Sequence, residues 1–184
     1  METKKVRRRF ELADYLEEER FLEEQHRNGW KMVELKLPLS TYIFERCESE
    51  DYVYQLDFNS EKSGTGSYVQ LFEDCGWEYF YKFGNWYYFR KLRSEVESEN
   101  VIFNDGPSRA EMAKKVAKFQ AGLSVFLIFP LIYLLTVVSA KAIDSSLVLT
   151  IMVALIAIVM VISAGIQLKN MWKLNKIIEK EEQL

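Results

Sequence analysis

Residues 121–168 read AGLSVFLIFPLIYLLTVVSAKAIDSSLVLTIMVALIAIVMVISAGIQL, two apolar runs separated by a short polar break. The runs 121–140 and 145–168 contain no charged residue, whereas the break contains Lys141 and Asp144. About 20 apolar residues let a helix cross the hydrocarbon core of a bilayer. Core helices of soluble proteins are rarely apolar on every side over that length. The sequence therefore predicts a two-helix transmembrane hairpin in residues 119–168, with spans at about 121–140 and 145–168.

The basic residues that flank the two runs predict the orientation of the hairpin. Four precede the first run and four follow the second, whereas the break between the runs holds only one (Arg109, Lys114, Lys115, Lys118; Lys169, Lys173, Lys176, Lys180; Lys141). Because positive charge favours the cytoplasmic side, we expect a multi-pass protein of the cell membrane with both termini cytoplasmic.

Small residues lie near the cytoplasmic end of both predicted spans. Helices in a bilayer approach most closely where side chains are small. Gly122 and Ala164–Gly165 therefore predict the closest contact of the hairpin. Residues 94–118 are expected to form an acidic linker and a juxtamembrane helix, and residues 169–184 an amphipathic cytoplasmic tail.

The remaining composition limits the function. The chain has 184 residues and a net charge of −3, and over residues 1–118 acidic residues outnumber basic ones by 23 to 19. This balance argues against nucleic-acid binding, which requires a basic surface. The two cysteines, Cys47 and Cys75, do not have metal-ligand spacing. We expect no cofactor.

Residues 1–93 predict one α+β domain built from two similar units, at about 6–46 and 51–91. Each unit reads as strand, helix, strand, strand, with strands expected at 6–12, 30–37, 41–46, 51–58, 77–83 and 86–91. Gly29–Trp30 in the first unit matches Gly76–Trp77 in the second, and 42–44 matches 87–89. The fold class is therefore a duplicated βαββ domain followed by the transmembrane hairpin, and we expect both helices on one face of the sheet or sheets.

The polar residues of the domain do not form a recognisable catalytic set. The only histidine, His26, is expected on the polar side of the first helix, and Glu17, Glu18, Glu23 and Glu24 are expected to face water. Cys75 lies on an apolar stripe and reads as a small core residue. No phosphate-binding, dinucleotide-binding or hydrolase motif occurs. The chain is not expected to be an enzyme.

Aromatic residues are unusually dense in the domain. Residues 1–93 contain 20 of them, and Trp77, Tyr79, Tyr81 and Phe83 are expected to share one strand face. Most must form the core, since aromatic side chains dominate burial in small domains. The surplus predicts a binding surface for a small apolar ligand or a protein partner. The candidate ligand-binding residues are Trp77, Tyr79, Tyr81, Trp86 and Tyr88.

Several short motifs together resemble a known bacterial family. They are Phe10–Glu11, Asp14–Tyr15, Gly29–Trp30, Tyr52–Phe58, Phe72–Glu73, Gly76–Tyr79 and Trp86–Lys91. In this order they resemble the family catalogued as domain of unknown function 2812, over about residues 6–118. The resemblance implies membrane helices after the domain and no established activity. It also implies a setting in Gram-positive bacteria beside PadR-like transcriptional regulators.

These observations favour a membrane-anchored cytoplasmic sensor or regulator that is not an enzyme. Its aromatic sheet would bind a small apolar ligand or a protein. The alternative is an accessory or scaffold subunit whose hairpin packs against a membrane transporter complex.

Overall fold

The computed structural model describes residues 2–60, 65–96, 109–124, 132 and 147–181. The fold is α+β, as predicted. The helices and strands are β1 (Thr3–Arg7), η1 (Leu12–Asp14), α1 (Tyr15–Arg27), β2 (Trp30–Lys36), β3 (Thr41–Arg46), β4 (Tyr52–Phe58), α2 (Thr65–Asp74), β5 (Glu78–Phe83), β6 (Trp86–Leu92), η2 (Arg93–Glu95) and α4 (Leu147–Glu181), with a further helix at 109–124. β1 begins and ends earlier than the predicted strand at 6–12, because Phe10 and Leu12 pack against the core outside any strand.

The strands form two antiparallel sheets of three strands each. The first sheet has the order β1-β3-β2, and the second has the order β4-β6-β5. Each unit of the sequence therefore builds its own sheet, with its last strand in the centre. Both sheets contain a bulge between their second and third strands, at Met32/Glu34 and at Tyr79/Tyr81.

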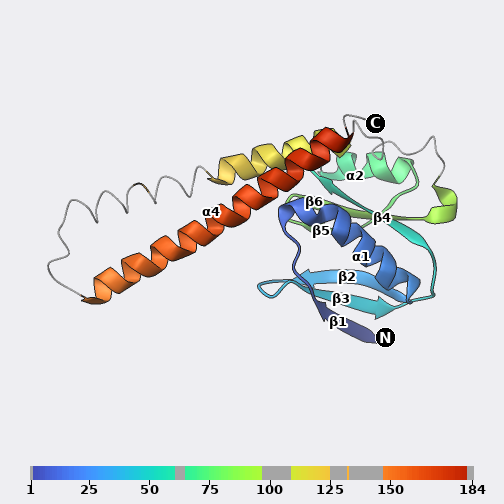
Figure 1. Ribbon diagram of the computed structural model, residues 1–184. Coiled ribbons are helices and arrows are strands. Elements are labelled where there is room, and N and C mark those ends of the chain that lie inside the picture. Colours follow the sequence, from blue (N-terminus) through green and yellow to red (C-terminus); the bar gives the residue numbers. More distant parts are fainter. Residues whose placement is uncertain (1, 61–64, 97–108, 125–131, 133–146, 182–184) are drawn as a thin grey trace.

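Helix α1 lies between the two sheets, and α2 covers the outer face of the second sheet (Figure 1). One core joins α1 to Tyr42 and Phe44 of the first sheet and to Leu56 and Tyr88 of the second. A separate core joins α2 to the opposite face of the second sheet, through Phe72, Trp77, Tyr87 and Phe89. The expectation that both helices share one face was wrong, because the second sheet buries both of its faces.

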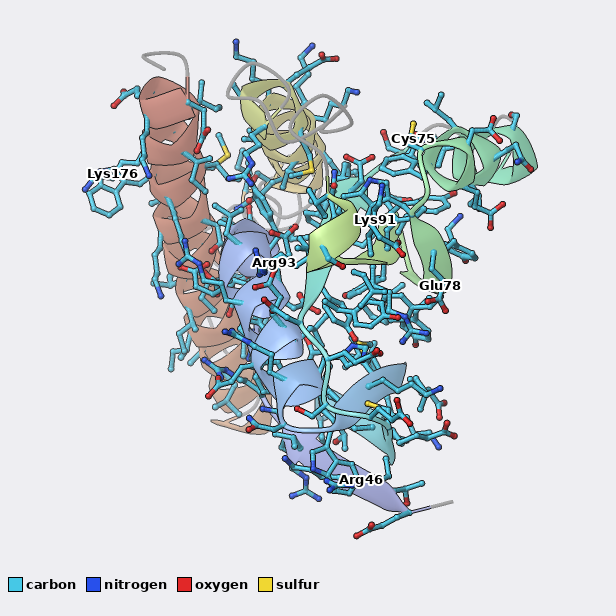
Figure 2. The ribbon with its side chains drawn as sticks, turned by 90° about the vertical axis from the view of Figure 1, so that its right-hand side faces the viewer. Arg46, Cys75, Glu78, Lys91, Arg93 and Lys176 are labelled. Atoms are coloured by element: carbon cyan, nitrogen blue, oxygen red, sulfur yellow. The ribbon has the colours of Figure 1, made fainter. Side chains whose placement is uncertain are left out.

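The two domain helices end in the same way. Gly29 and Gly76 follow α1 and α2 with φ +80°, a conformation that glycine adopts without a Cβ clash. A basic side chain then donates to the last carbonyl before each glycine. Lys91 Nζ donates to Cys75 O at 2.9 Å, and Arg46 Nη1 lies 3.5 Å from Asn28 O. Figure 2 labels Lys91 beside Cys75, and Arg46 at the opposite end of the domain.

The C-terminal part of α4 packs against the α+β domain (Figure 1). Leu174 is fully buried in the same core as Tyr15 of α1. Lys173 Nζ lies 2.5 Å from Asp14 Oδ1 and 2.7 Å from Glu17 Oε1. Residues 169–181, which were predicted to belong to an amphipathic tail, therefore continue α4 onto the domain.

The N-terminal part of α4 has the properties of a membrane span. Residues 154–181 are the one candidate span among the described residues, with a mean hydropathy of 1.7. Large apolar side chains are exposed along it (Leu155, Ile156, Ile158, Val159, Val161, Ile162, Leu168). This segment overlaps the predicted second span, whereas most of the predicted first span, 121–140, lies outside the described residues.

Polar side chains, not glycines, join α4 to helix 109–124. Gln120 is 2% exposed, and its Nε2 donates to Gln167 O at 2.9 Å. Ser124 Oγ hydrogen-bonds to Gln167 Oε1. A Cβ built on Gly122 or Gly165 meets nothing within 4 Å. The predicted close approach at the glycines was therefore wrong.

Candidate functional site

A cavity of about 290 Å³ lies where the first turn of α1 meets both sheets. Its volume is close to the lower limit of small-molecule pockets. Leu37 and Arg9 form part of its rim and are 63% and 70% exposed, so the cavity is open to solvent. Six aromatic side chains line it, from the segment before η1 and from α1, β3, β5 and β6 (Phe10, Tyr15, Tyr42, Phe83, Trp86, Tyr88).

A buried carboxylate, Glu18, forms part of the cavity wall. Only 7% of Glu18 is exposed. Its Oε1 accepts hydrogen bonds from the Tyr42 hydroxyl at 2.7 Å and the Tyr88 hydroxyl at 2.8 Å. Burial raises the pKa of Glu18, the two hydroxyl groups oppose that rise, and the neighbouring Asp14 adds to it. A central strand of each sheet therefore contributes one donor to this carboxylate.

The expectation that Glu18 faces water was wrong. Glu18 lies three residues after Tyr15 and four before Leu22, which places all three side chains on one face of α1. That face is buried. A charged residue within an apolar stripe was the signal that sequence reasoning missed.

The five aromatic candidates lie on two different faces of the second sheet. Trp86 and Tyr88 line the cavity. Tyr81 lies beside it, and its hydroxyl donates to Leu35 O at 3.0 Å, linking the two sheets. Trp77 and Tyr79 instead pack under α2.

The bulge in β5 causes this division. Between Tyr79 and Tyr81 the pairing with β6 shifts by one residue, so the alternation of faces changes at that point. The expectation that Trp77, Tyr79, Tyr81 and Phe83 share one face was therefore wrong. The cavity takes its aromatic side chains from both units instead.

His26 is also buried, contrary to expectation, with 3% of its surface exposed. Its ring stacks on Tyr52 at 4.2 Å between centroids, and Nδ1 lies 2.8 Å from the Tyr54 hydroxyl. Burial, together with the nearby Arg90 and Lys31, lowers the pKa of His26 to about 4. A neutral imidazole can accept a hydrogen bond from the Tyr54 hydroxyl, so His26 links α1 to β4.

Two further carboxylates of α1 accept hydrogen bonds from backbone N–H groups on the free edge of β4. Glu19 Oε1 accepts from the Leu56 backbone N–H at 2.8 Å, and Glu23 Oε1 lies 3.4 Å from the Tyr54 backbone nitrogen. Burial raises the pKa of Glu19 to about 8. These contacts cover an edge strand, so Glu19 and Glu23 have a structural explanation.

A second cavity adjoins this edge of β4, but it is too small to hold a drug-sized ligand. Its volume is about 70 Å³, which is room for about two water molecules at roughly 30 Å³ each. The Tyr15 hydroxyl is buried without a hydrogen-bond partner among the described residues. Of these two cavities, the one lined by aromatic side chains is therefore the candidate ligand site. A larger and more open depression, of about 430 Å³, lies on the surface of helix 109–124 and is lined mainly by charged side chains.

Cys75, expected in the core, is partly buried and packs against the cluster under α2. Within the described part of the chain, no group of three His, Cys, Asp or Glu side chains is placed to hold a metal ion.

Comparison with protein families identifies the chain. The family described as "Protein of unknown function (DUF2812)" matches residues 14–125, which include most of the α+β domain and helix 109–124. The chain belongs to this family. No curated protein and no solved structure matches it.

Proposed function

We propose that this chain is a membrane-anchored regulatory protein, not an enzyme, which binds a small ligand in the aromatic cavity. One observation carries the proposal. At the start of α1, Tyr15 and Glu18 line the cavity, whereas Glu17 and the N-cap residue Asp14 bind Lys173 of α4. The same turn of helix therefore touches both the ligand site and the helix that continues toward the membrane.

A second route connects the cavity to helix 109–124. Trp86 of the cavity lies 5.2 Å from Phe58, measured between ring centroids, and Phe58 lies 5.3 Å from Phe119. Closely packed interiors transmit displacement, because they have few voids in which side chains can relax. A ligand that binds two arrangements of this core with different affinity would shift the balance between them.

The test uses hydrogen–deuterium exchange on the full chain in zwitterionic nanodiscs. Three aromatic probes of different charge are added in turn: benzyltrimethylammonium, neopentylbenzene and benzylsulfonate. A bound probe should slow exchange in residues 10–18 and also change exchange in residues 170–181 of α4. If no probe protects residues 10–18, or if α4 never responds, the proposal fails.

A pair of lysine variants isolates the connection. Lys173→Met removes the bonds to Asp14 and Glu17, so protection of residues 10–18 should persist while the response in α4 disappears. Lys176 is the matched control. It lies one turn away on the outer side of α4, over the Trp172 ring at 3.8 Å (Figure 2). Lys176→Met should leave both responses intact.

We further propose that the chain crosses the membrane twice, with both termini in the cytoplasm. The exposed apolar side chains of α4 support one span, and the uncharged run 121–140 supports the other. A cysteine placed at Ile143, in a background in which Cys47 and Cys75 are replaced by serine, should react with an impermeant thiol reagent added outside intact cells. Labelling of that cysteine only after lysis would contradict this topology.

We also propose that the two βαββ units arose by duplication. Support comes from the matching strand order, the bulge at the corresponding place in each sheet, and the positive-φ glycine after each helix. In this alignment Tyr42 corresponds to Tyr87, and Ile43 corresponds to Tyr88.

A further inference from the structure

The charges that line the cavity define the chemistry of its ligand. Three lining residues are charged: Arg9, Glu11 and Glu18. Arg9 Nε lies 3.3 Å from Glu11 Oε1, so these two rim charges offset each other. Glu18 has no basic partner among the lining residues. Its two hydrogen bonds come from tyrosine hydroxyl groups, which are neutral. An ionised Glu18 therefore places in the cavity a negative charge that no lining residue balances.

The rest of the lining suits the same ligand. Aromatic rings attract cations through the negative potential of their faces, most strongly for Trp and Tyr. The cavity combines Trp86 with three tyrosines, Tyr15, Tyr42 and Tyr88. Leu12, Leu35 and Phe83 add apolar surface for an uncharged body. A ring of aromatic side chains around one carboxylate complements a positively charged nitrogen on an apolar group.

We propose that the cavity binds an organic monocation, an amine or quaternary ammonium with an aromatic or aliphatic body, whose nitrogen faces Glu18. This inference rests on the proposed function and specifies its ligand class. The volume of about 290 Å³ limits the ligand to a small molecule. An anion would be repelled by Glu18, and a neutral compound would leave the carboxylate without a counter-charge.

The test compares benzyltrimethylammonium with neopentylbenzene, which has the same shape with carbon in place of the charged nitrogen, and with benzylsulfonate. Binding to the full chain in zwitterionic nanodiscs is measured by calorimetry and by the fluorescence of Trp86. The remaining tryptophans (Trp30, Trp77, Trp172) are replaced by phenylalanine for the fluorescence measurement. We expect the cation to bind at least tenfold more tightly than either of the other probes.

Two variants locate the charge that matters. Glu18→Gln keeps an acceptor for both tyrosine hydroxyls but removes the negative charge, so cation affinity should fall at least tenfold while neopentylbenzene binding is unchanged. Glu24→Gln is the matched control, since Glu24 is an exposed residue of the same helix. It should leave the affinity of all three probes unchanged.

The possible outcomes separate this inference from the proposed function. If neopentylbenzene or benzylsulfonate binds as tightly as the cation, the ligand class is wrong and the ligand site stands. If Glu24→Gln weakens cation binding as much as Glu18→Gln does, the nitrogen does not face Glu18. If none of the probes binds or protects residues 10–18, both proposals fail. Should Glu18→Gln not fold, the comparison of the three probes on the unmodified chain still decides the ligand class.

Discussion

Replacing Tyr42 by phenylalanine removes one of the two hydrogen bonds to Glu18 and keeps the aromatic ring. Tyr42 is 2% exposed and its ring lies 5.5 Å from Phe21, so the phenylalanine ring should keep the same packing while the hydroxyl is lost. A hydrogen bond to a charged group contributes about 1.5–3 kcal/mol. We expect Tyr42→Phe to reduce the free energy of unfolding by about 2 kcal/mol where Glu18 is ionised.

The dependence of this loss on pH follows from the pKa of Glu18. Burial raises that pKa above the unfolded value of 4.5, so the folded state holds the proton more tightly and stability falls as pH rises from 4.5 through the folded pKa. The Tyr42 hydroxyl stabilises the ionised carboxylate and limits this fall. Tyr42→Phe should therefore reduce the free energy of unfolding more at pH 8 than at pH 5. Glu18→Gln, which has no proton to release, should remove this part of the pH dependence.

The assay is urea unfolding of the full chain in detergent micelles, followed by tryptophan fluorescence at pH 5 and pH 8. In the Glu18→Gln background Tyr42→Phe removes a neutral hydrogen bond and should cost only about 0.5–1.5 kcal/mol. In a thermal unfolding measurement, a loss of 2 kcal/mol would lower Tm by about 8–16 °C for a domain of about 100 residues. Equal losses in the two backgrounds, at both pH values, would refute the account of Glu18 as a buried carboxylate held by two hydroxyl groups.

Four further variants test the structural contacts by unfolding measurements. His26→Gln should remove an acid-sensitive component of stability. Because burial lowers the pKa of His26 from 6.5 to about 4, the wild-type folded state loses about 3 kcal/mol of stability as pH falls through that range. Glu19→Gln should remove a pH dependence of the opposite sign, since burial raises the pKa of Glu19 from 4.5 to about 8. Wild-type stability therefore declines as pH rises through that interval, and the glutamine variant should lack that decline. Gly29→Ala and Gly76→Ala should each cost about 1–2 kcal/mol from the positive φ alone. Gly29→Ala should cost more, because its Cβ would lie 3.1 Å from the Cys47 carbonyl oxygen, whereas at Gly76 it would meet the movable end of Lys91 at 3.0 Å.

Local patterns in the sequence were enough to predict most of the elements. Strands at 41–46 and 51–58 were predicted within one residue of β3 and β4. The glycines that end the two domain helices were identified as well, since positive φ strongly favours glycine. Hydropathy indicated the apolar segment of α4 that is the candidate membrane span among the described residues. These features depend on a few neighbouring residues, and local sequence determines them.

The candidate site could not be predicted in the same way, because it depends on contacts between distant segments. A single bulged residue in β5 moved Tyr81 and Phe83 to the opposite face from Tyr79, and strict alternation cannot reveal a bulge. Glu18 and His26 were predicted to face solvent because of their residue types, although both lie on the buried face of α1. Their partners, Tyr42, Tyr88 and Tyr54, are 24 to 70 residues away in the chain.

The position of α1 explains why the domain contains so many aromatic residues. In β3 burial alternates along the strand, as expected for a sheet covered on one face. In β6 the four consecutive residues Trp86–Phe89 are all buried, because α1 packs against one face and α2 against the other. Two-sided burial of the second sheet therefore accounts for most of the aromatic surplus. What remains is the ring of side chains around Glu18, where both sheets face the same turn of α1. This is the place where a ligand would contact both units at once, and where Lys173 connects that turn to α4.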